Sequence, residues 1–526
     1  MHSDTPSPTR AAAEAVNDAR AALTDSARAA AIERQHRLGK LSARERLAAL
    51  VDPGSFHEIG ALVQPKRDTF DTEHLQAPAD GVLTGHARID GRPVGLCAFD
   101  FTVLGGSNGR IGEHKVERIA THCLEHGCPL VLLLDGGGHR IQEGLDSRHF
   151  AEGSRYFQIA ADLSGWVPTV AVIMGPGFAG PSNFAALCDL VIMVRGTSTM
   201  GIAGPALVAA ATGEATDKDT LGGAEVQADR NGLADLVAEN DAQALHWVRR
   251  YLEFMPSNAE GTPPAAAPAE PDPADEEALL TIVPDNPRTP YDVHGVVRAI
   301  ADPDSVFEIK PRFAPNLVTA LARLGGRAVG IVANQPLHLA GTLDAKACEK
   351  GAHFVSVCDA FGLPLVYLVD LPGFLVGQEA EDSALARRSA RLLFELGQAS
   401  VPRLSVVMRK GYGLGYIAMC GGRSFDADLC VAWPTAEICA MSVEGAVDVA
   451  YARQVAAAPD PAARRTELIG RFRQQLGPLH AAAHFGIDDV IDPRETRAAL
   501  LATLERCPGR KQRRERSPRR HGISPI

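Results

Sequence analysis

The chain has 526 residues, of which 45% are hydrophobic, and a formal net charge of −11. A chain of this length exceeds what one hydrophobic core supports and fits two large domains. It contains neither a run of roughly eighteen apolar residues nor a charged N-terminal stretch followed by an apolar one, so we expect no membrane span and no secretory signal. The ten cysteines form no CxxC pair, which excludes a zinc ribbon and indicates buried free thiols in a reducing, cytoplasmic compartment.

The N-terminal part of the chain is predicted to be helical. Residues 11–50 are rich in Ala, Arg and Glu at helical spacing. Ser42 is followed three residues later by Glu45, which predicts a capping box at the start of a helix.

The rest of the chain repeats itself. Residues 91–95 return as residues 326–330, and residues 127–135 return as residues 362–370, both 235 positions later. Two further matches keep the same order, at offsets of 250 and 234. Such a long repeat indicates a duplicated domain, because solenoid units recur every 20 to 50 residues or so.

The domain boundaries follow from composition. Residues 259–275 are rich in Pro, Ala and acidic side chains and lie between the copies, which is typical of a linker. We therefore predict an N-terminal domain over residues 1–258 and a C-terminal domain over residues 276–526.

Within each copy, short apolar runs alternate with helical segments. Residues 130–134, 170–174 and 365–369 are continuously apolar, and residues 404–408 are apolar except for Ser405. Runs that are buried on both faces and separated by helices indicate mostly parallel strands. The predicted fold class is α/β, with two tandem domains of the same fold.

The first candidate site follows residues 130–134. Asp135 is succeeded by three glycines, which lack the Cβ that keeps a ligand away from backbone amides. If a helix starts at His139 or just after it, the Gly137 and Gly138 amides lie at its positive end and form an oxyanion hole, in which each donor is worth about 10²–10³ in rate. Taken alone, such a turn favours a tight connection that binds nothing.

A second glycine turn, in the other copy, changes this balance. Residues 404–408 lead into Arg409-Lys410-Gly411-Tyr412-Gly413-Leu414-Gly415-Tyr416, and the first-copy counterpart is Gly175-Pro176-Gly177-Phe178-Ala179-Gly180. One duplicated scaffold that presents two dissimilar amide turns suggests that two carbonyl-bearing substrates meet.

A set of ordered motifs surrounds these turns, at residues 39–46, 100–107, 140–144, 212–214, 221–224, 331–336, 370–374 and 432–436, with a last match at 521–523. Together they resemble the carboxyltransferase (β) subunit of biotin-dependent acyl-CoA carboxylases, of the propionyl-, acetyl- and methylcrotonyl-CoA type. The resemblance covers nearly the whole chain.

This resemblance implies two crotonase-like (ClpP/crotonase) domains and a role for each turn. The Gly137 and Gly138 amides would hold the acyl-CoA thioester oxygen as an enolate, and the Leu414 and Gly415 amides would hold the ureido oxygen of biotin. The substrate-binding residues expected around them are Gly105, Gly106, His139, Arg140, Gly177, Phe178, Ala179, Gly180, Gly413 and Ile417. No side chain is required as a general base and no metal is expected, because the biotin nitrogen takes the α-proton.

The resemblance also implies partners. Biotin must arrive on a separate carrier, since none of the eight Met residues precedes a Lys, as the usual biotinylation motif requires. We expect a biotin carboxylase/biotin carboxyl carrier subunit as the partner. The family's active site forms between the N-domain of one subunit and the C-domain of another, which implies a homodimer and usually a hexamer of three dimers.

The C-terminal tail is strongly basic. Residues 506–520 carry eight Arg or Lys and one Glu, a local charge of +7. Such a tail can bind nucleic acid, but no aromatic residues are interleaved, so we favour a solvated or subunit-docking tail and expect no nucleic-acid partner.

Several positions depart from the family pattern. Gly136 and His139 stand where Ser and Ala are usual, and His139 either assists at the enolate site or points away from it. Phe178 and Pro181 add bulk near the acyl pocket, or only pack, and Ile417 replaces a frequent Asp. The identity of the acyl group therefore stays open.

These departures leave two alternative functions. One is a biotin-independent decarboxylase of malonyl-type thioesters, or another crotonase-type enolate enzyme. The other is a non-catalytic scaffold subunit of a carboxylase complex, against which the intact glycines argue.

Overall fold

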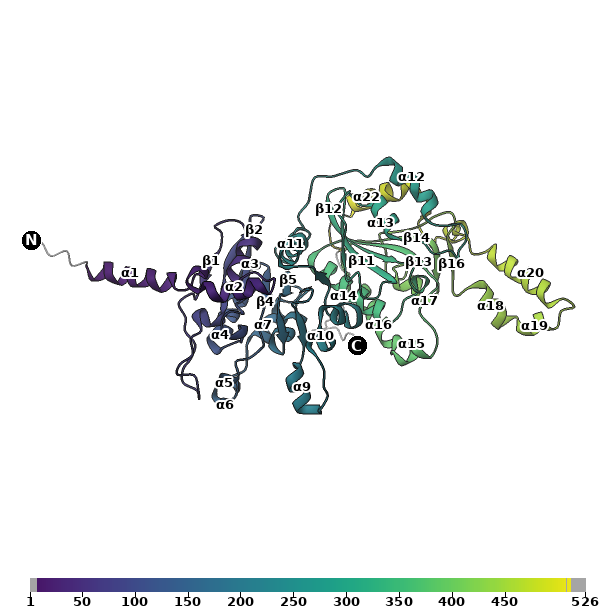
Figure 1. Cartoon of the computed structure of the whole chain (residues 1–526). Coiled ribbons are helices and arrows are strands. Elements are labelled where there is room, and N and C mark those ends of the chain that lie inside the picture. Colours follow the sequence, from purple (N-terminus) through teal and green to yellow (C-terminus); the bar gives the residue numbers. More distant parts are fainter. Residues whose placement is uncertain (1–6, 508, 512–526) are drawn as a thin grey trace, which may run out of the picture. The chain divides into compact units, whose positions relative to one another are not determined.

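The computed structural model describes residues 7–507 and 509–511. The chain forms two compact units, divided in sequence between Gly261 and Thr262. Each unit has its own sheet and its own hydrophobic core (Figure 1). Most of the basic tail at residues 506–520 lies outside the described residues.

The sheet of the first unit has seven strands in the order β1-β2-β3-β4-β5-β7-β9. The first three pair antiparallel, and from β3 onward neighbouring strands run parallel. The strands are His57–Ile59 (β1), Val82–Ile89 (β2), Arg92–Phe99 (β3), Leu130–Leu134 (β4), Thr169–Ile173 (β5), Leu190–Val194 (β7) and Leu236–Ala238 (β9), and a separate two-stranded sheet joins Pro176–Phe178 (β6) to Thr199–Gly201 (β8). Every residue of β4, β5 and β7 is buried, which explains their unbroken apolar sequences.

The second unit repeats this topology in the order β10-β11-β12-β13-β14-β15-β17, with β16 paired to β14. The strands are Phe307–Ile309 (β10), Leu317–Leu324 (β11), Arg327–Asn334 (β12), Leu365–Leu371 (β13), Arg403–Tyr412 (β14), Leu429–Ala432 (β15), Glu437–Cys439 (β16) and Asp489–Val490 (β17). Again the first three strands are antiparallel and the others parallel. The predicted α/β class is confirmed, with the antiparallel edge as an addition.

The helices complete both units. Those of the first unit are Pro8–Ala21 (α1), Ala29–Arg37 (α2), Ala43–Leu50 (α3), Arg110–His126 (α4), Ile141–Gly144 (α5), Ser147–Phe150 (α6), Tyr156–Leu163 (α7), Gly180–Ala186 (α8), Pro205–Thr212 (α9), Lys218–Gly222 (α10) and Asp241–Leu252 (α11). Those of the second unit are Pro273–Ile282 (α12), His294–Ile300 (α13), Ala345–Phe361 (α14), Gln378–Asp382 (α15), Leu385–Gln398 (α16), Gly413–Ala418 (α17), Val443–Ala450 (α18), Ala452–Ala456 (α19), Pro461–Arg473 (α20), Pro478–Ala483 (α21) and Thr496–Arg506 (α22). No helix among the described residues is long and apolar enough to cross a membrane.

Strand positions agree closely with the sequence pattern. The apolar run at residues 130–134 coincides with β4, whereas β14 continues four residues beyond the run at 404–408. The extension arises because β16 pairs with the end of β14, at Lys410, Gly411 and Tyr412. This pairing holds the second glycine turn close to the sheet.

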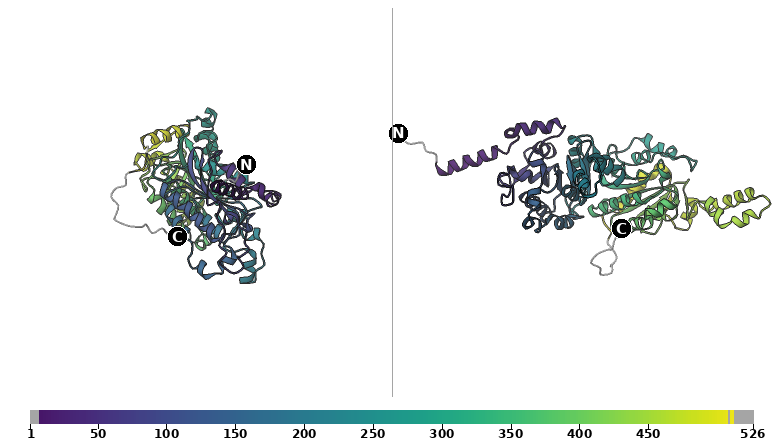
Figure 2. Two further views of the ribbon diagram at one scale, coloured as in Figure 1. Left: turned by 90° about the vertical axis from the view of Figure 1, so that its left-hand side faces the viewer. Right: turned by 60° about the horizontal axis from the view of Figure 1, so that its bottom comes forward.

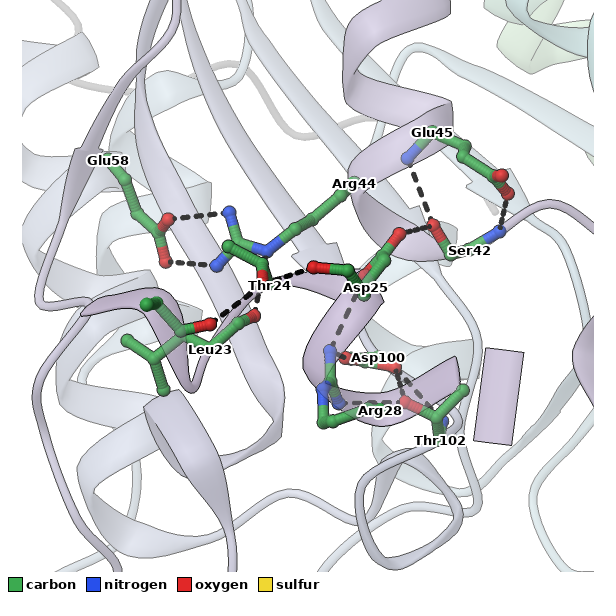
Figure 3. A network of polar contacts seen from close by, with 12 residues as sticks. Leu23, Thr24, Asp25, Arg28, Ser42, Arg44, Glu45, Glu58, Asp100 and Thr102 are labelled. Carbon is green, nitrogen blue, oxygen red and sulfur yellow. Dashed lines mark hydrogen bonds and ion pairs between the residues drawn. The ribbon is translucent and has the colours of Figure 1, made fainter. Parts of the chain in front are cut away.

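The third N-terminal helix, α3, begins as predicted. The Glu45 amide donates to the Ser42 side chain at 3.1 Å, and the Ser42 amide donates to the Glu45 carboxylate at 2.8 Å (Figure 3). The capping box at the start of α3 is therefore confirmed.

The segment between the two repeats is bound along the second unit. The Ala266 amide donates to the Gly326 carbonyl at 2.9 Å, and the Arg323 guanidinium donates to the Pro264 carbonyl at 2.8 Å. The Pro-rich chain is thereby held in an extended path until α12 begins at Pro273.

Two helical segments pack against little or no hydrophobic core. α9 is apolar, yet none of its residues is buried. Helices α18 to α20 form an arm that projects from the second unit around a small cluster of Val443, Val447 and Leu468 (Figures 1 and 2).

Candidate active site

Two glycine turns at strand ends carry the predicted chemistry, and the first follows β4. The Gly136 amide donates to the Pro176 carbonyl at 2.9 Å, whereas the Gly137 amide reaches the Gly105 carbonyl only at 3.4 Å. The Gly138 amide has no acceptor among the described residues, and nothing lies within 4 Å of where a Gly137 side chain would begin. The Gly138 amide is thus available to an oxygen ligand, and the Gly137 amide is held only by this long bond.

The helix after this turn starts two residues after His139. α5 begins at Ile141 rather than at His139 itself, and it is only four residues long. The cause is a bridge in which the Asn108 amide donates to the Gly138 carbonyl at 2.7 Å and the Arg140 amide donates to the Asn108 carbonyl at 2.8 Å. The amides of this turn are therefore not reinforced by the dipole of a long helix.

The short 3-10 turn Leu104–Gly106 packs directly on this site. A side chain on Gly106 would begin 2.0 Å from the Asp135 carbonyl oxygen, and one on Gly136 would begin 2.0 Å from the Gly106 carbonyl oxygen. Two backbones touch here, so both positions require glycine. The second copy has the same close contact at Gly341, which favours a structural role in shaping the turn.

The side chains of His139 and Arg140 are engaged by carboxylates. His139 Nδ1 lies 3.2 Å from Glu113 of α4. The buried Arg140 guanidinium donates to Asp80 at 2.7 Å and to Glu143 at 2.6 Å. This placement favours the interpretation in which His139 points away from the enolate, and it favours a role for Arg140 in holding the turn.

Strand β6 brings residues 177–180 against the first turn. The Phe178 carbonyl oxygen lies 3.1 Å from where a Gly138 side chain would begin. The Phe178 ring rests on two glycines, because side chains on Gly201 and Gly222 would begin 3.0 and 3.3 Å from it. The Phe178 backbone thus borders the candidate thioester site, while its half-buried ring packs on Gly201 and Gly222.

Ala179 has a strained backbone at this position. Its φ of 65° and ψ of −123° lie where residues with side chains are rare. The counterpart 234 positions later is Gly413, with φ of 62°. Gly180 follows as the first residue of α8, with open space around its Cα.

The second turn joins β14 to α17. Leu414 and Gly415 open this helix, where amides have no acceptor within the helix, and no described residue accepts from either of them. Gly415 is buried, and a side chain there would begin 2.7 Å from the Leu371 side chain. Leu414 is exposed, and Ile417 is half-buried on the same helix.

The two copies differ in where proline stands in their turns. The strand registers align the first turns of the two copies at an offset of 235 and the second turns at 234. The counterpart of Gly137 is then Pro372, and the counterpart of Gly415 is Pro181. Because proline has no N–H, each copy keeps one complete pair of amides and lacks one amide of the other pair.

Sequence reasoning missed the cations that hold the strand ends. Asp135 contacts Lys40 and Arg46, each at 2.7 Å, and Asp370 contacts Arg409 at 3.0 Å. Both carboxylates had a signal in the sequence, because each copy's apolar strand ends in Asp. The cations of the first copy lie outside the repeat, so no offset could identify them.

A cavity of about 890 Å³ lies next to the second turn. Its lining includes Pro372, Lys410 and Tyr412, and the Tyr412 hydroxyl donates to Glu437 at 2.5 Å. Burial raises the pKa of Tyr412, so this hydroxyl stays protonated. Over the part of the chain that the structure describes, no group of three His, Cys, Asp or Glu is arranged to hold a metal ion.

Residues 34–523 match the family model described as carboxyl transferase domain. The chain is 40% identical to the propionyl-CoA carboxylase carboxyltransferase subunit of Haloferax mediterranei, over 94% of this chain and 95% of that protein. It is 37% identical to methylmalonyl-CoA decarboxylase subunit alpha of Veillonella parvula, over 94% of this chain and 95% of that protein. Among solved structures it is similar to transcarboxylase 12S, a hexamer with methylmalonyl-coenzyme A and methylmalonic acid bound, with a TM-score of 0.92, 39% identity and 100% coverage of both chains.

Proposed function

The chain belongs to the carboxyl transferase domain family, and we propose that it is the carboxyltransferase subunit of a biotin-dependent acyl-CoA carboxylase. Its two tandem domains are crotonase-like. The reaction moves CO₂ from biotin on a carrier protein to the α carbon of an acyl-CoA. The observation that carries this proposal is the pair of prolines, Pro372 and Pro181, which leaves each copy with one complete pair of amides.

The first copy acts on the acyl-CoA. The Gly137 and Gly138 amides donate to the thioester oxygen, and their bonds strengthen as that oxygen gains charge in the enolate. Gly106 and Gly136 allow the backbones to approach, so the amides are held without moving during the reaction. A loss of one such donor costs about 10²–10³ in rate.

The second copy fits biotin. The amides of Leu414 and Gly415 have no protein acceptor among the described residues, and the adjacent cavity of about 890 Å³ has room for a bicyclic ring. Biotin supplies the carboxyl group and a ureido nitrogen that can take the α-proton. The chain itself holds the ureido oxygen through these two amides and needs no general base.

The partners follow from the same proposal. A biotin carboxylase/biotin carboxyl carrier subunit brings the cofactor. Identical copies of this chain assemble as a dimer and then as a hexamer. The apolar α9, with no buried residue in the isolated chain, supports such an assembly. All ten cysteines are free thiols, which supports a cytoplasmic location.

The proposed substrate is a short acyl-CoA. The Phe178 backbone carbonyl lies beside Gly138 and its ring rests on Gly201 and Gly222, so this residue occupies space next to the turn. The names of the relatives, propionyl-CoA and methylmalonyl-CoA, support the same size class.

One assay tests the function. The purified chain is incubated with malonyl-CoA, methylmalonyl-CoA and acyl-CoAs of increasing length, with and without biotin or a biotinylated carrier. Turnover that requires biotin and falls with chain length is the expected result. Absence of turnover with every partner would instead indicate a scaffold subunit.

A second candidate function is decarboxylation. The similarity to a methylmalonyl-CoA decarboxylase subunit favours it, since the same enolate forms when a malonyl-type thioester loses CO₂. In the assay above, CO₂ release from methylmalonyl-CoA without biotin would support this function and overturn biotin dependence.

A further inference from the structure

The first glycine turn is held by residues that precede the repeat. Asp135, the residue before the turn, has a fully buried side chain. Its carboxylate accepts from Lys40 and from Arg46 at 2.7 Å each, and from Gln35 at 3.1 Å. All three donors come from α2, α3 and the link between them.

The same N-terminal segment also grips the neighbouring strand end. Arg28 donates to Asp100 and to Thr102 at 2.9 Å each (Figure 3). Asp100 follows β3 and starts the loop that leads to Gly105, whose carbonyl faces the Gly137 amide. The N-terminal segment that contains Arg28 and Lys40 therefore contacts both the loop after β3 and the end of β4.

The second copy solves the same problem differently. Asp370 accepts from the Arg409 side chain at 3.0 Å, and Arg409 lies on the adjacent strand β14. The first-copy counterpart of Arg409 is Gly175. A side chain there would begin 1.9 Å from the Asp135 carboxylate and 2.7 Å from the Lys40 ammonium, so Lys40 occupies the space that an arginine side chain takes in the other copy.

Electrostatics gives these cations a second effect. A buried carboxylate one residue from the turn repels an enolate unless it is neutralised, because the interior screens charges poorly. Arg46 is shared, since it also donates to Asp241 at 2.7 Å. Lys40 pairs with no carboxylate but Asp135 among the described residues.

We propose that Lys40 is a positioning residue for the acyl-side turn: it holds and neutralises Asp135, so that the Gly137 and Gly138 amides meet an enolate oxygen. The inference rests on the proposed function, because it takes the ligand of this turn to be an acyl-CoA enolate. This role predicts that the loss of Lys40 affects one part of ligand binding and not another. Loss of Lys40 weakens binding of an anionic oxygen at the turn but leaves recognition of the CoA portion unchanged.

Two CoA probes measure this selectivity by titration calorimetry. 2-Nitropropionyl-CoA ionises to a planar anion whose charge is shared between the nitro group and the thioester oxygen, whereas S-propyl-CoA is a thioether without that oxygen. For Lys40→Met we expect at least tenfold weaker binding of the anion and less than a twofold change for the thioether. The matched control is Lys115→Met, which removes another buried lysine of the same unit, one that donates to the Ala79 carbonyl at 2.9 Å and not to Asp135.

Each outcome has a distinct meaning. If neither probe binds the unmodified protein, the proposed function fails. If both bind it and Lys40→Met weakens both equally, or neither, the positioning role is overturned. Should Lys40→Met not fold, Gln35→Met removes a neutral donor of the same carboxylate; a threefold loss of preference for the anion is expected, and an unchanged preference contradicts the inference.

Discussion

At the scale of single residues, the contact of His139 with a carboxylate favours the interpretation in which its side chain points away from the enolate site. Its Nδ1 lies 3.2 Å from Glu113, and a side chain on Gly144 would begin 2.7 Å from its ring. The imidazole therefore packs on α4 and α5 rather than over the open side of Gly137. Neither contact was visible in the sequence, because each depends on how helices fold back onto the turn.

We expect His139→Ala to leave carboxyl transfer within about threefold, since it removes a packed side chain and no hydrogen bond to the substrate. Initial rates with saturating acyl-CoA measure this. Glu113→Gln, which removes the partner, should behave alike. A loss of about a hundredfold in His139→Ala alone would show that the imidazole takes part in the reaction.

A second histidine makes stability depend on pH. Hydrogen bonds to Glu308, opposed by burial and assisted by Asp292, raise the pKa of His294 to about 9. A folded-state pKa above the unfolded value of about 6.5 means that this stabilisation is complete below pH 6.5 and is lost as the pH rises through 9. His294→Gln should thus lower the melting temperature at pH 6 but not at pH 10, while the exposed His246 replaced by Gln should lower it at neither. Equal losses at both pH values would contradict the ion-pair explanation.

At the scale of elements, the strand-to-helix turns depend on backbone conformation more than on side chains. The short α5 shows the limit of sequence reasoning: a helix start at or just after His139 was expected, but not the bridge to Asn108 that places the start at Ile141. The glycine turns themselves were predictable, although close backbone contact requires glycine only at Gly106 and Gly136 and leaves open space beside Gly137. The strain at Ala179 was not, because nothing in an alanine signals a positive φ.

Gly138→Ala tests the first turn. With φ of 86° at this position, a side chain strains the backbone and begins 3.1 Å from the Phe178 carbonyl oxygen. We expect the transfer rate to fall by about 10²-fold, as for the loss of one oxyanion donor. The matched control is Gly91→Ala, with φ of 76° and open surroundings, which should cost about 1 kcal/mol of stability and leave the rate unchanged. Equal rate losses in both variants would attribute the effect to general destabilisation.

At the scale of the whole molecule, the duplication was readable from constant offsets, and the α/β class from unbroken apolar strands. The N-terminal segment was not assigned a role, because its contacts with Asp135 join residues 95 positions apart, outside any repeat. The same holds for the exposed α9, whose apolar sequence resembles that of a core helix. Contacts between residues that are far apart in the sequence produce no local pattern, such as a helical or strand period, from which they could be predicted.

The distribution of thiols gives a test at this scale. Eight of the ten cysteines are buried, and Cys439 and Cys507 are partly accessible. Burial raises the pKa of Cys439 to about 11, so even this thiol is slow to ionise. Titration with an aromatic disulfide reagent at pH 8 should label no more than two thiols in the native protein and all ten after unfolding. Fewer than ten in the unfolded protein would reveal a disulfide.

The Arg46–Asp241 contact also has a consequence during synthesis. It joins residues 195 positions apart, so Arg46 leaves the ribosome long before its partner exists. At about 5–20 residues per second, the wait is roughly 10–40 s. The first glycine turn therefore acquires its full support only when translation has nearly finished the first unit, at a time when the second glycine turn has not yet been made.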